Sequence, residues 1–325
     1  MPTGFVHGLL RAIAVVMGVV TLTFVLLHLA PGDPAQRLLG PAATPVQIGA
    51  ARHALGLDRS LATQYLSWLA HAASGDFGTS IATGRRVGAL LAGAWPATAI
   101  LVVLSLSLTY LIGIAIGTLQ ANLRHRFADG SLTVITVALN ALPGYWLGLV
   151  LIMVFTYQLR WLPSFGASGV DADFLGAGGR ILDRLRHLVL PLVTLTMIGV
   201  GGAARFVRAA MREARDAPYL VVARSKGIGR ARTVFRHQLR NALVPVVTLL
   251  GLSLPALFSG TVFVEAIFAW PGVGQLMVQG VQARDYPVVM AAATVSAVLV
   301  VLGNLLADIL VGVVDPRTRR SHGQD

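Results

Sequence analysis

Six long apolar stretches are the feature that most constrains how this 325-residue chain can fold. A helix needs about 20 mainly apolar residues to cross the hydrocarbon core of a bilayer. The stretches meet that requirement, so lipid must be part of the solvent of this protein. The sequence therefore predicts an all-α integral membrane fold with about six transmembrane helices. They are expected at Ala12–Ala30, Ala97–Leu119, Leu132–Tyr157, Leu188–Ala204, Val244–Phe268 and Pro287–Val313.

The low charge of the chain supports this prediction. Charged residues make up 12% of the sequence, against about 25% in an ordinary soluble domain. The formal net charge is nevertheless +12. Nucleic acid is one partner for such a chain, but bacterial membrane proteins concentrate Lys and Arg in cytoplasmic loops. We therefore expect a membrane-lipid environment and no nucleic-acid partner. The chain has no cysteine, which excludes disulfides and thiolate metal sites.

The first apolar stretch indicates an uncleaved span. It is longer than the 7–15-residue core of a signal peptide. It also ends in Pro31-Gly-Asp-Pro34, which is not a small-x-small cleavage site.

The distribution of basic residues predicts the orientation. The N-terminus, the segments 120–131 and 205–243 and the C-terminal tail hold 16 of the 26 Lys and Arg residues, and the remaining loops hold 10. The positive-inside rule then predicts that both termini lie in the cytoplasm. We expect the chain in a bacterial plasma (inner) membrane. We expect a division into residues 1–96, a first span plus an outer segment, and residues 97–325, the core transmembrane domain.

The outer segment predicts two short amphipathic helices. Thr44-Pro-Val-Gln47 is a capping box with proline at the first helical position. Gly56 is a good residue to end that helix. Asp58 is expected to cap a second helix that runs toward Gly75.

Two features inside the spans predict how they pack. Gly113 and Gly117 lie one turn apart and allow a neighbouring helix to approach closely. Pro143 interrupts the third span and should kink it. Backbone groups freed by such a break are tolerated only against protein or a water-filled cavity. We therefore expect this stretch, including Tyr145, to face the bundle interior.

The chain shows no motif for catalysis. It has no phosphate-binding Gly-x-x-x-x-Gly-Lys-Ser/Thr loop, no His-Glu-x-x-His and no Gly-x-Ser-x-Gly. The eight histidines show no metal-ligand spacing. We expect no catalytic residue, no metal and no cofactor on this chain.

The most informative loop lies between the fourth and fifth spans. Asp216 can cap a short helix that should end at Gly227 or Gly229, and a second helix should start near Arg230. This helix–turn–helix elbow is apolar on one side and basic on the other. From the residues alone, docking in a groove of a partner protein and lying on anionic lipid are about equally favoured.

The loop resembles the signature loop of binding-protein-dependent ABC importer permeases, Glu-Ala-Ala-x-x-x-Gly. Ala223 and Gly227 match, whereas Val221 and Val222 replace the Glu and the first Ala. The sequence Ala-Arg-Ser-Lys-Gly is similar to that of the dipeptide, oligopeptide and nickel branch, and to its first permease in particular. The similarity extends over about 290 residues. It includes Pro31–Pro34, Leu55–Asp58, Gly75–Ser80, Trp161–Pro163, His237–Pro245, Val264–Gly274, Asp285–Pro287, Asn304–Asp308 and Asp315–Arg317.

The resemblance implies a type I ABC importer permease (MetI-like) fold and a four-part core. The partners are a second homologous permease subunit and two cytoplasmic ATPase subunits that bind ATP-Mg. A periplasmic or lipid-anchored solute-binding protein delivers the solute. The elbow then becomes the ATPase-coupling loop. Its residues are Tyr219, Leu220, Val222, Ala223, Arg224, Lys226, Gly227 and Gly229.

Acidic residues in spans are candidates for function by default. Glu265 near the outer end of the fifth span is a candidate for the solute path, with Pro143 and Tyr145, or orders the turn that follows it. Asp308 is expected to pair with Arg317 or another cytoplasmic base. The alternatives are a self-sufficient secondary transporter, which needs polar groups inside its spans, and a structural membrane subunit. The solute stays open among dipeptides, oligopeptides, nickel chelates, glutathione and sugars.

Overall fold

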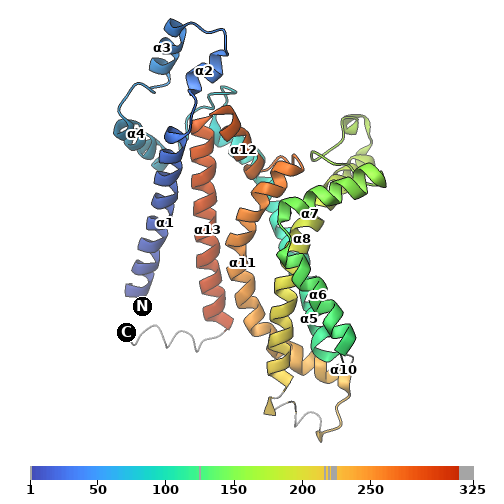
Figure 1. The fold of residues 1–325 in the computed structure, drawn as a ribbon. Helices are drawn as coiled ribbons and strands as arrows, with labels where there is room; N and C mark the ends of the chain where they lie inside the picture. Colours follow the sequence, from blue (N-terminus) through green and yellow to red (C-terminus); the bar gives the residue numbers. More distant parts are fainter. Residues whose placement is uncertain (1, 124–125, 216, 219, 221–224, 315–325) are drawn as a thin grey trace. The chain divides into compact units, whose positions relative to one another are not determined.

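A computed structural model describes residues 2–123, 126–215, 217–218, 220 and 225–314 of the chain. This part is helical apart from turns and an isolated β-bridge, so the predicted all-α fold is confirmed (Figure 1). The chain divides into two compact units. The first unit comprises residues 1–99 and 269–301, and the second comprises residues 100–268 and the end of the last helix.

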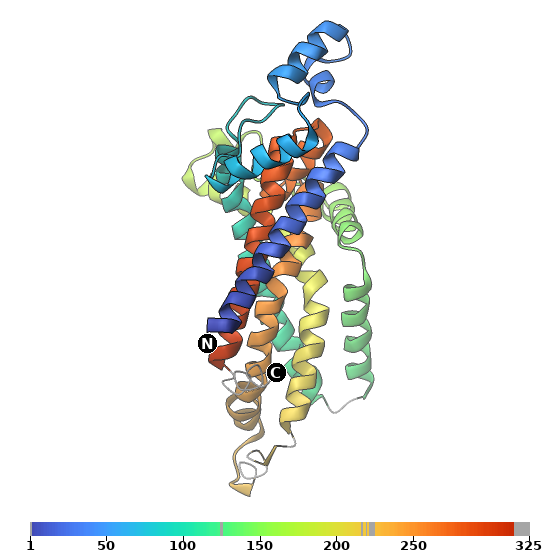
Figure 2. The same cartoon turned by 90° about the vertical axis from the view of Figure 1, so that its left-hand side faces the viewer.

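The first unit packs its N-terminal helix along its C-terminal helix. Val20 and Leu27 of α1 share a buried cluster with Val289 and Met290 of α13, and the two helices run side by side in Figures 1 and 2. The helices of this unit are α1 (Pro2–Leu29), α2 (Pro34–Leu39), α3 (Pro45–Ala54), α4 (Leu61–Ala73), the start of α5 (Val87–Asn122), α12 (Val273–Ala283) and most of α13 (Tyr286–Val314).

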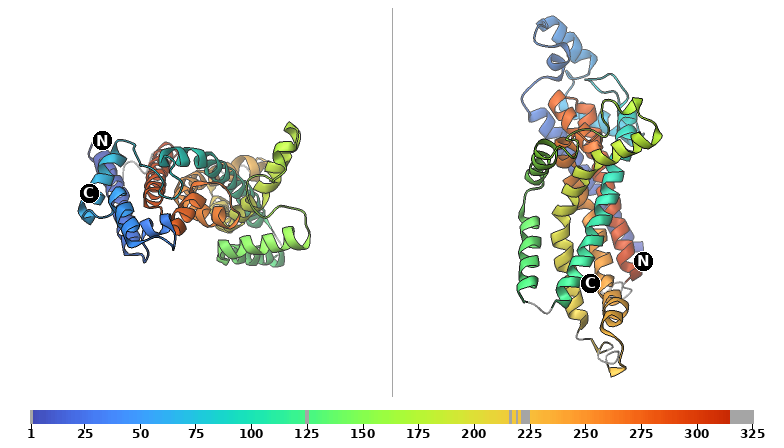
Figure 3. Two further views of the ribbon diagram at one scale, coloured as in Figure 1. Left: turned by 90° about the horizontal axis from the view of Figure 1, so that it is seen from above. Right: turned by 90° about the vertical axis from the view of Figure 1, so that its right-hand side faces the viewer.

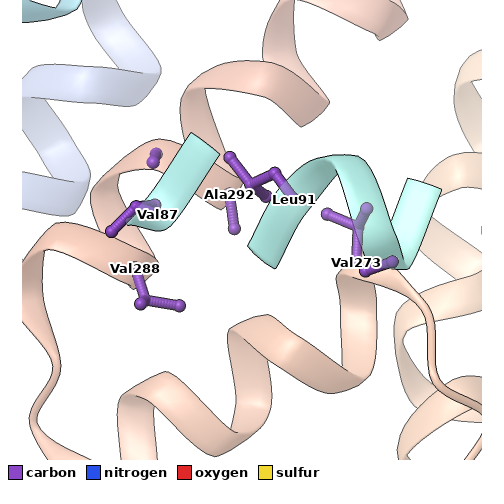
Figure 4. Close-up of a cluster of buried hydrophobic side chains, with 7 residues drawn as sticks. Val87, Leu91, Val273, Val288 and Ala292 are labelled. Atoms are coloured by element: carbon purple, nitrogen blue, oxygen red, sulfur yellow. The ribbon is translucent and has the colours of Figure 1, made fainter. Parts of the chain in front are cut away.

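The expected division at residue 96 lies close to the end of the first segment of this unit at residue 99, and residues 269–301 also belong to the first unit. Figure 4 shows the reason. Val87 and Leu91 of α5 are buried against Val273 of α12 and against Val288 and Ala292 of α13. Hydropathy along the chain did not reveal this long-range pairing.

A buried carboxylate reinforces the same junction. Asp285 is 2% exposed and accepts hydrogen bonds from Ser80 Oγ at 2.5 Å and from the amides of Ile81 and Ala82, each at 3.1 Å. A buried carboxylate needs such donors to be stable. Asp285 therefore ties the turn before α5 to the start of α13.

The outer segment forms both predicted short helices, with one correction. The capping box of Thr44 and Gln47 is present, and Gly56 follows α3 with φ 67°. However, Ser60 and not Asp58 caps α4. Asp58 instead accepts a hydrogen bond of 2.6 Å from His53, which lowers the pKa of its carboxyl. Ser60 is the cap because it lies three residues before Thr63, so its hydroxyl can accept a hydrogen bond from the Thr63 amide.

The second unit is built around α8 (Ala177–Arg215), a helix of 39 residues that packs on α6 and α11. Its other helices are the rest of α5, α6 (Arg126–Ala141), α7 (Gly144–Leu151), the π-helix η1 (Ile152–Gln158), the short 3-10 helix η2 (Ala172–Phe174), α10 (Arg230–Arg232), the π-helix η3 (Thr233–Gln238) and α11 (Leu239–Ile267). The two π-helices were not predicted.

The small residues of α5 let α8 approach closely, as predicted. A Cβ atom at Gly113 would lie 2.6 Å from Ala203 Cβ, and one at Gly117 would lie 2.5 Å from the carbonyl oxygen of Ala204. No side chain fits at either position. Close backbone contact of this kind stabilises helix pairs in lipid, where no hydrophobic force drives them together.

Four helices in the described residues are long and apolar enough to cross a membrane: Leu10–Leu29, Val87–Asn122, Ala177–Arg215 and Tyr286–Leu305. The kinked span expected over Leu132–Tyr157 is a broken pair, α6 and α7 with η1, bent by 103° at Pro143 (Figure 3, right). Counting this pair as one span gives five. The remaining expected span coincides with α11, in which several side chains lie outside the described part.

Candidate functional site

The predicted elbow is present where its residues are described. Ser225 is helical, Lys226 and Gly227 form a turn, and α10 begins at Arg230 and leads through η3 into α11 without interruption. Lys226, Gly227 and Gly229 are exposed. Leu220 was predicted to belong to the coupling surface, but it is fully buried, so its side chain packs inside the protein and does not contribute to that surface. Tyr219, Val222, Ala223 and Arg224 lie outside the described residues.

Gly227 has the backbone conformation that glycine commonly adopts just after the end of a helix. Its φ is 72°, in the left-handed region that favours glycine. A Cβ atom at Gly227 or at Gly229 would meet no other atom within 4 Å. The two glycines are thus equally open, but only Gly227 is held in the left-handed conformation.

The base of the elbow is fastened to α8. Gln238 is 2% exposed, and its Nε2 donates a hydrogen bond of 2.6 Å to the carbonyl oxygen of Met211. Met211 belongs to a buried cluster that joins α5, α8 and α11. Thr233 Oγ1 lies 3.1 Å from the carbonyl oxygen of Gly229 and donates to it. The base of the elbow is therefore attached to α8 within a cluster that also contains residues of α5 and α11.

Charged groups tie α6 to the same end of α8. Arg208 forms an ion pair with Asp129, and its guanidinium donates a hydrogen bond of 2.9 Å to Thr133 Oγ1. Arg212 approaches Asp129 at 3.2 Å. Arg208 and Arg212 flank Met211 on α8, so α6 is joined to α8 beside the residue that holds the base of the elbow.

The structure does not gather the three candidates for the solute path. Glu265 is fully buried in the second unit, whereas Pro143 is exposed and Tyr145 is 55% exposed. The prediction that this stretch faces the interior of the bundle is wrong for Tyr145. After the break, α7 buries Leu147 and Gly148, the latter against Phe268, and this leaves Tyr145 on the outside.

Asp308 was expected to pair with Arg317. The side chain of Asp308 and all of Arg317 lie outside the described residues. Among the residues that are described, no group of three or more His, Asp or Glu side chains could hold a metal ion.

The sequence analysis missed a polar cluster in the second unit. The side chains of Thr156, Arg160, Arg186 and His187 line a cavity together with Asp183. The one signal available was the concentration of four arginines in residues 158–187, a segment read only as an outer loop.

Two family descriptions match this chain. Residues 110–320 match the binding-protein-dependent transport system inner membrane component, and residues 3–102 match the N-terminal membrane component of such systems. One solved chain similar in structure is described as "an amino acid ABC transporter with histidines". Its TM-score is 0.51 at 14% identity, over 68% of this chain and 92% of that one, which supports the fold alone.

Curated relatives match along almost their whole length. The oligopeptide transport system permease protein AppB of Bacillus subtilis is 39% identical over 98% of this chain and 99% of its own. The probable D,D-dipeptide transport system permease protein DdpB of Escherichia coli is 38% identical over 96% of both. The glutathione transport system permease protein GsiC of Salmonella typhi is 35% identical over 96% of this chain and 97% of its own.

Proposed function

Because this chain belongs to the family of binding-protein-dependent transport system inner membrane components, we propose that it forms half of the translocation path of an importer for peptides or similar small solutes. The chain is a permease subunit of an ABC importer and not itself an enzyme. The peptide class rests on relatives described as permeases for oligopeptides and D,D-dipeptides.

The elbow is the part of this chain that couples transport to ATP. The observation that carries this assignment is its attachment, because Gln238 fastens the base of an exposed glycine turn to Met211 of α8. A rigid base is required if a push on the loop is to move the transmembrane helices. Lys226, Gly227 and Gly229 are the described exposed residues of the loop. Tyr219, Val222, Ala223 and Arg224 complete the proposed docking surface.

The proposed assembly has four membrane-associated parts. This subunit pairs with a second, homologous permease, and each loop docks on one of two cytoplasmic ATPases that bind ATP-Mg. A periplasmic or lipid-anchored binding protein supplies the solute. Closure of the ATPases draws the two loops together and switches the path between its inward-open and outward-open forms. Glu265, Pro143 and Tyr145 stay the proposed contributors to that path, although they do not share one surface of this chain.

The assembly is tested by reconstituting uptake of labelled alanine peptides in vesicles. Uptake is expected only with both permeases, both ATPases, the binding protein and ATP present. This chain alone is expected to transport nothing, because its path is shared with the partner permease. ATP-independent uptake by the purified single chain is the result that favours a secondary transporter instead.

We also propose that both termini lie in the cytoplasm. The 16-to-10 distribution of basic residues and the positive-inside rule support this orientation. A phosphatase reporter, which is active only outside the cytoplasm, is expected to be inactive when fused after Asp325 and active when inserted near Ala73. The opposite pair of activities would overturn the topology.

A further inference from the structure

A second site in this chain lies in the second unit, where a cavity of about 340 Å³ opens between η1, the loop after it and α8. Figure 1 shows the chain passing from α7 through this loop into the start of α8. The side chains that matter are those of Thr156, Arg160, Trp161, Asp183, Arg186 and His187. None of these residues has a role in the proposed function.

The backbone at this cavity is irregular in two independent ways. Thr156 belongs to the π-helix η1, a geometry that is rare and frequent at functional sites. Four residues later, Arg160 has φ 56°, which a non-glycine residue seldom adopts. Strained conformations of this kind cluster where a protein positions side chains for a ligand.

The hydrogen-bond donors of the cavity outnumber its acceptors. The carboxylate of Asp183 is already engaged, because its Oδ2 accepts a 2.8 Å bond from the Gly169 amide and its Oδ1 lies 3.4 Å from His187 Nδ1. Among the residues that the structure describes, neither Arg160 nor Arg186 has a carboxylate partner. The Thr156 hydroxyl is buried there with no hydrogen-bond partner. Arg160 and Arg186 are exposed residues, and their guanidinium groups together with the unsatisfied hydroxyl form a set of donors that fits an anion.

The cavity and the elbow lie at opposite ends of α8. Arg186 and Met211 are separated by 25 residues of one helix, and a rise of 1.5 Å per residue gives about 37 Å. The hydrocarbon core of a bilayer is about 30 Å thick. If the elbow faces the cytoplasm, the cavity opens on the outer side, where a solute arrives.

We propose that this cavity binds the terminal carboxylate of the peptide solute as it enters the permease, an inference that rests on the proposed function. A carboxylate is the planar anion that a guanidinium grips through two hydrogen bonds. Arg160 and Arg186 neutralise it, and the Thr156 hydroxyl donates the third bond. Trp161, which is 66% exposed, offers an apolar face to the side chain next to that carboxylate.

The test uses the complete complex of both permeases and both ATPases in nanodiscs, without the binding protein, so that only the membrane complex can recognise the ligand. The probes are trialanine and its C-terminal amide, and binding is measured by ligand-observed NMR. Trialanine is expected to bind, and the amide is expected to bind roughly tenfold or more weakly, because a charge-assisted bond is lost. Arg160→Gln and Arg186→Gln should each produce a loss of the same size.

The matched control is Arg184→Gln, which removes the same charge from an exposed arginine on the same helix outside the cavity. It should bind trialanine like the wild type. Equal binding of peptide and amide, or unchanged binding in both cavity variants, would overturn the carboxylate site.

Two further outcomes also count against it. Cavity variants that lose affinity for the binding protein but keep trialanine would make this surface a protein-docking site. If the difference in binding between trialanine and its amide vanishes when anionic lipid is replaced by neutral lipid, the cavity is a site for lipid headgroups. These results leave the proposed function standing, since ATP-dependent uptake by the wild type is measured separately.

Discussion

Replacing Gly227 by leucine is expected to abolish solute uptake and to leave the amount of this protein in the membrane unchanged. The φ of 72° costs a residue with a Cβ atom roughly 1–2 kcal/mol. No atom lies within 4 Å of a Cβ at this position, so the substitution acts through the backbone and not through a clash. The chain should leave the turn in a different direction, so the docking surface should no longer contact its ATPase.

Two companion variants isolate the backbone effect. Gly229→Leu adds the same side chain two residues away in the same loop, in equally open space but outside the left-handed region, and should reduce uptake much less than Gly227→Leu. Gly227→Asn should recover much of the uptake, because asparagine tolerates the left-handed conformation better than other residues.

The readouts are peptide uptake, the ATPase recovered with the purified permease, and binding to anionic vesicles. Gly227→Leu should lose the first two and keep the third, because Lys226 and its neighbouring arginines are unchanged. Loss of vesicle binding together with normal ATPase recovery would favour the lipid-binding alternative for this loop. Wild-type uptake in Gly227→Leu would contradict its role in coupling.

Replacing Gly117 by alanine is expected to destabilise the second unit strongly. The new methyl group would lie 2.5 Å from the carbonyl oxygen of Ala204 and 2.7 Å from Val207 Cβ, so α5 and α8 would have to separate. Overpacking of this kind costs about 1–3 kcal/mol, or more where backbone is involved. The thermal midpoint of the purified permease complex should fall by several degrees. It is measured as the fraction of intact complex that size-exclusion chromatography recovers after heating.

Gly93→Ala is the control on the same helix. A Cβ at Gly93 meets nothing within 4 Å, and alanine is the better helix former by about 1 kcal/mol. Its thermal midpoint should therefore stay the same or rise. If Gly117→Ala and Gly93→Ala melt alike, the close approach of α5 and α8 is not what holds this unit together.

The features that the sequence by itself determined are local ones. The length of an apolar run decides whether a helix can cross a bilayer, and Thr44 with Gln47 contains both halves of a capping box. The left-handed turn at Gly227 follows from the conformational freedom of that one residue. Such properties depend on neighbours a few positions away, so they can be predicted without knowing what packs against them.

Other features were decided only by the tertiary structure, because they depend on residues distant in sequence. The partners of Asp285 lie about 200 residues earlier in the chain, and nothing in either segment alone predicts that bond. Tyr145 is exposed because α7 turns its other side toward Phe268. Thr156 and Arg186 share a cavity because η1 and α8 meet there. Burial and pairing are properties of the packed helices, so they exist only once the chain has folded.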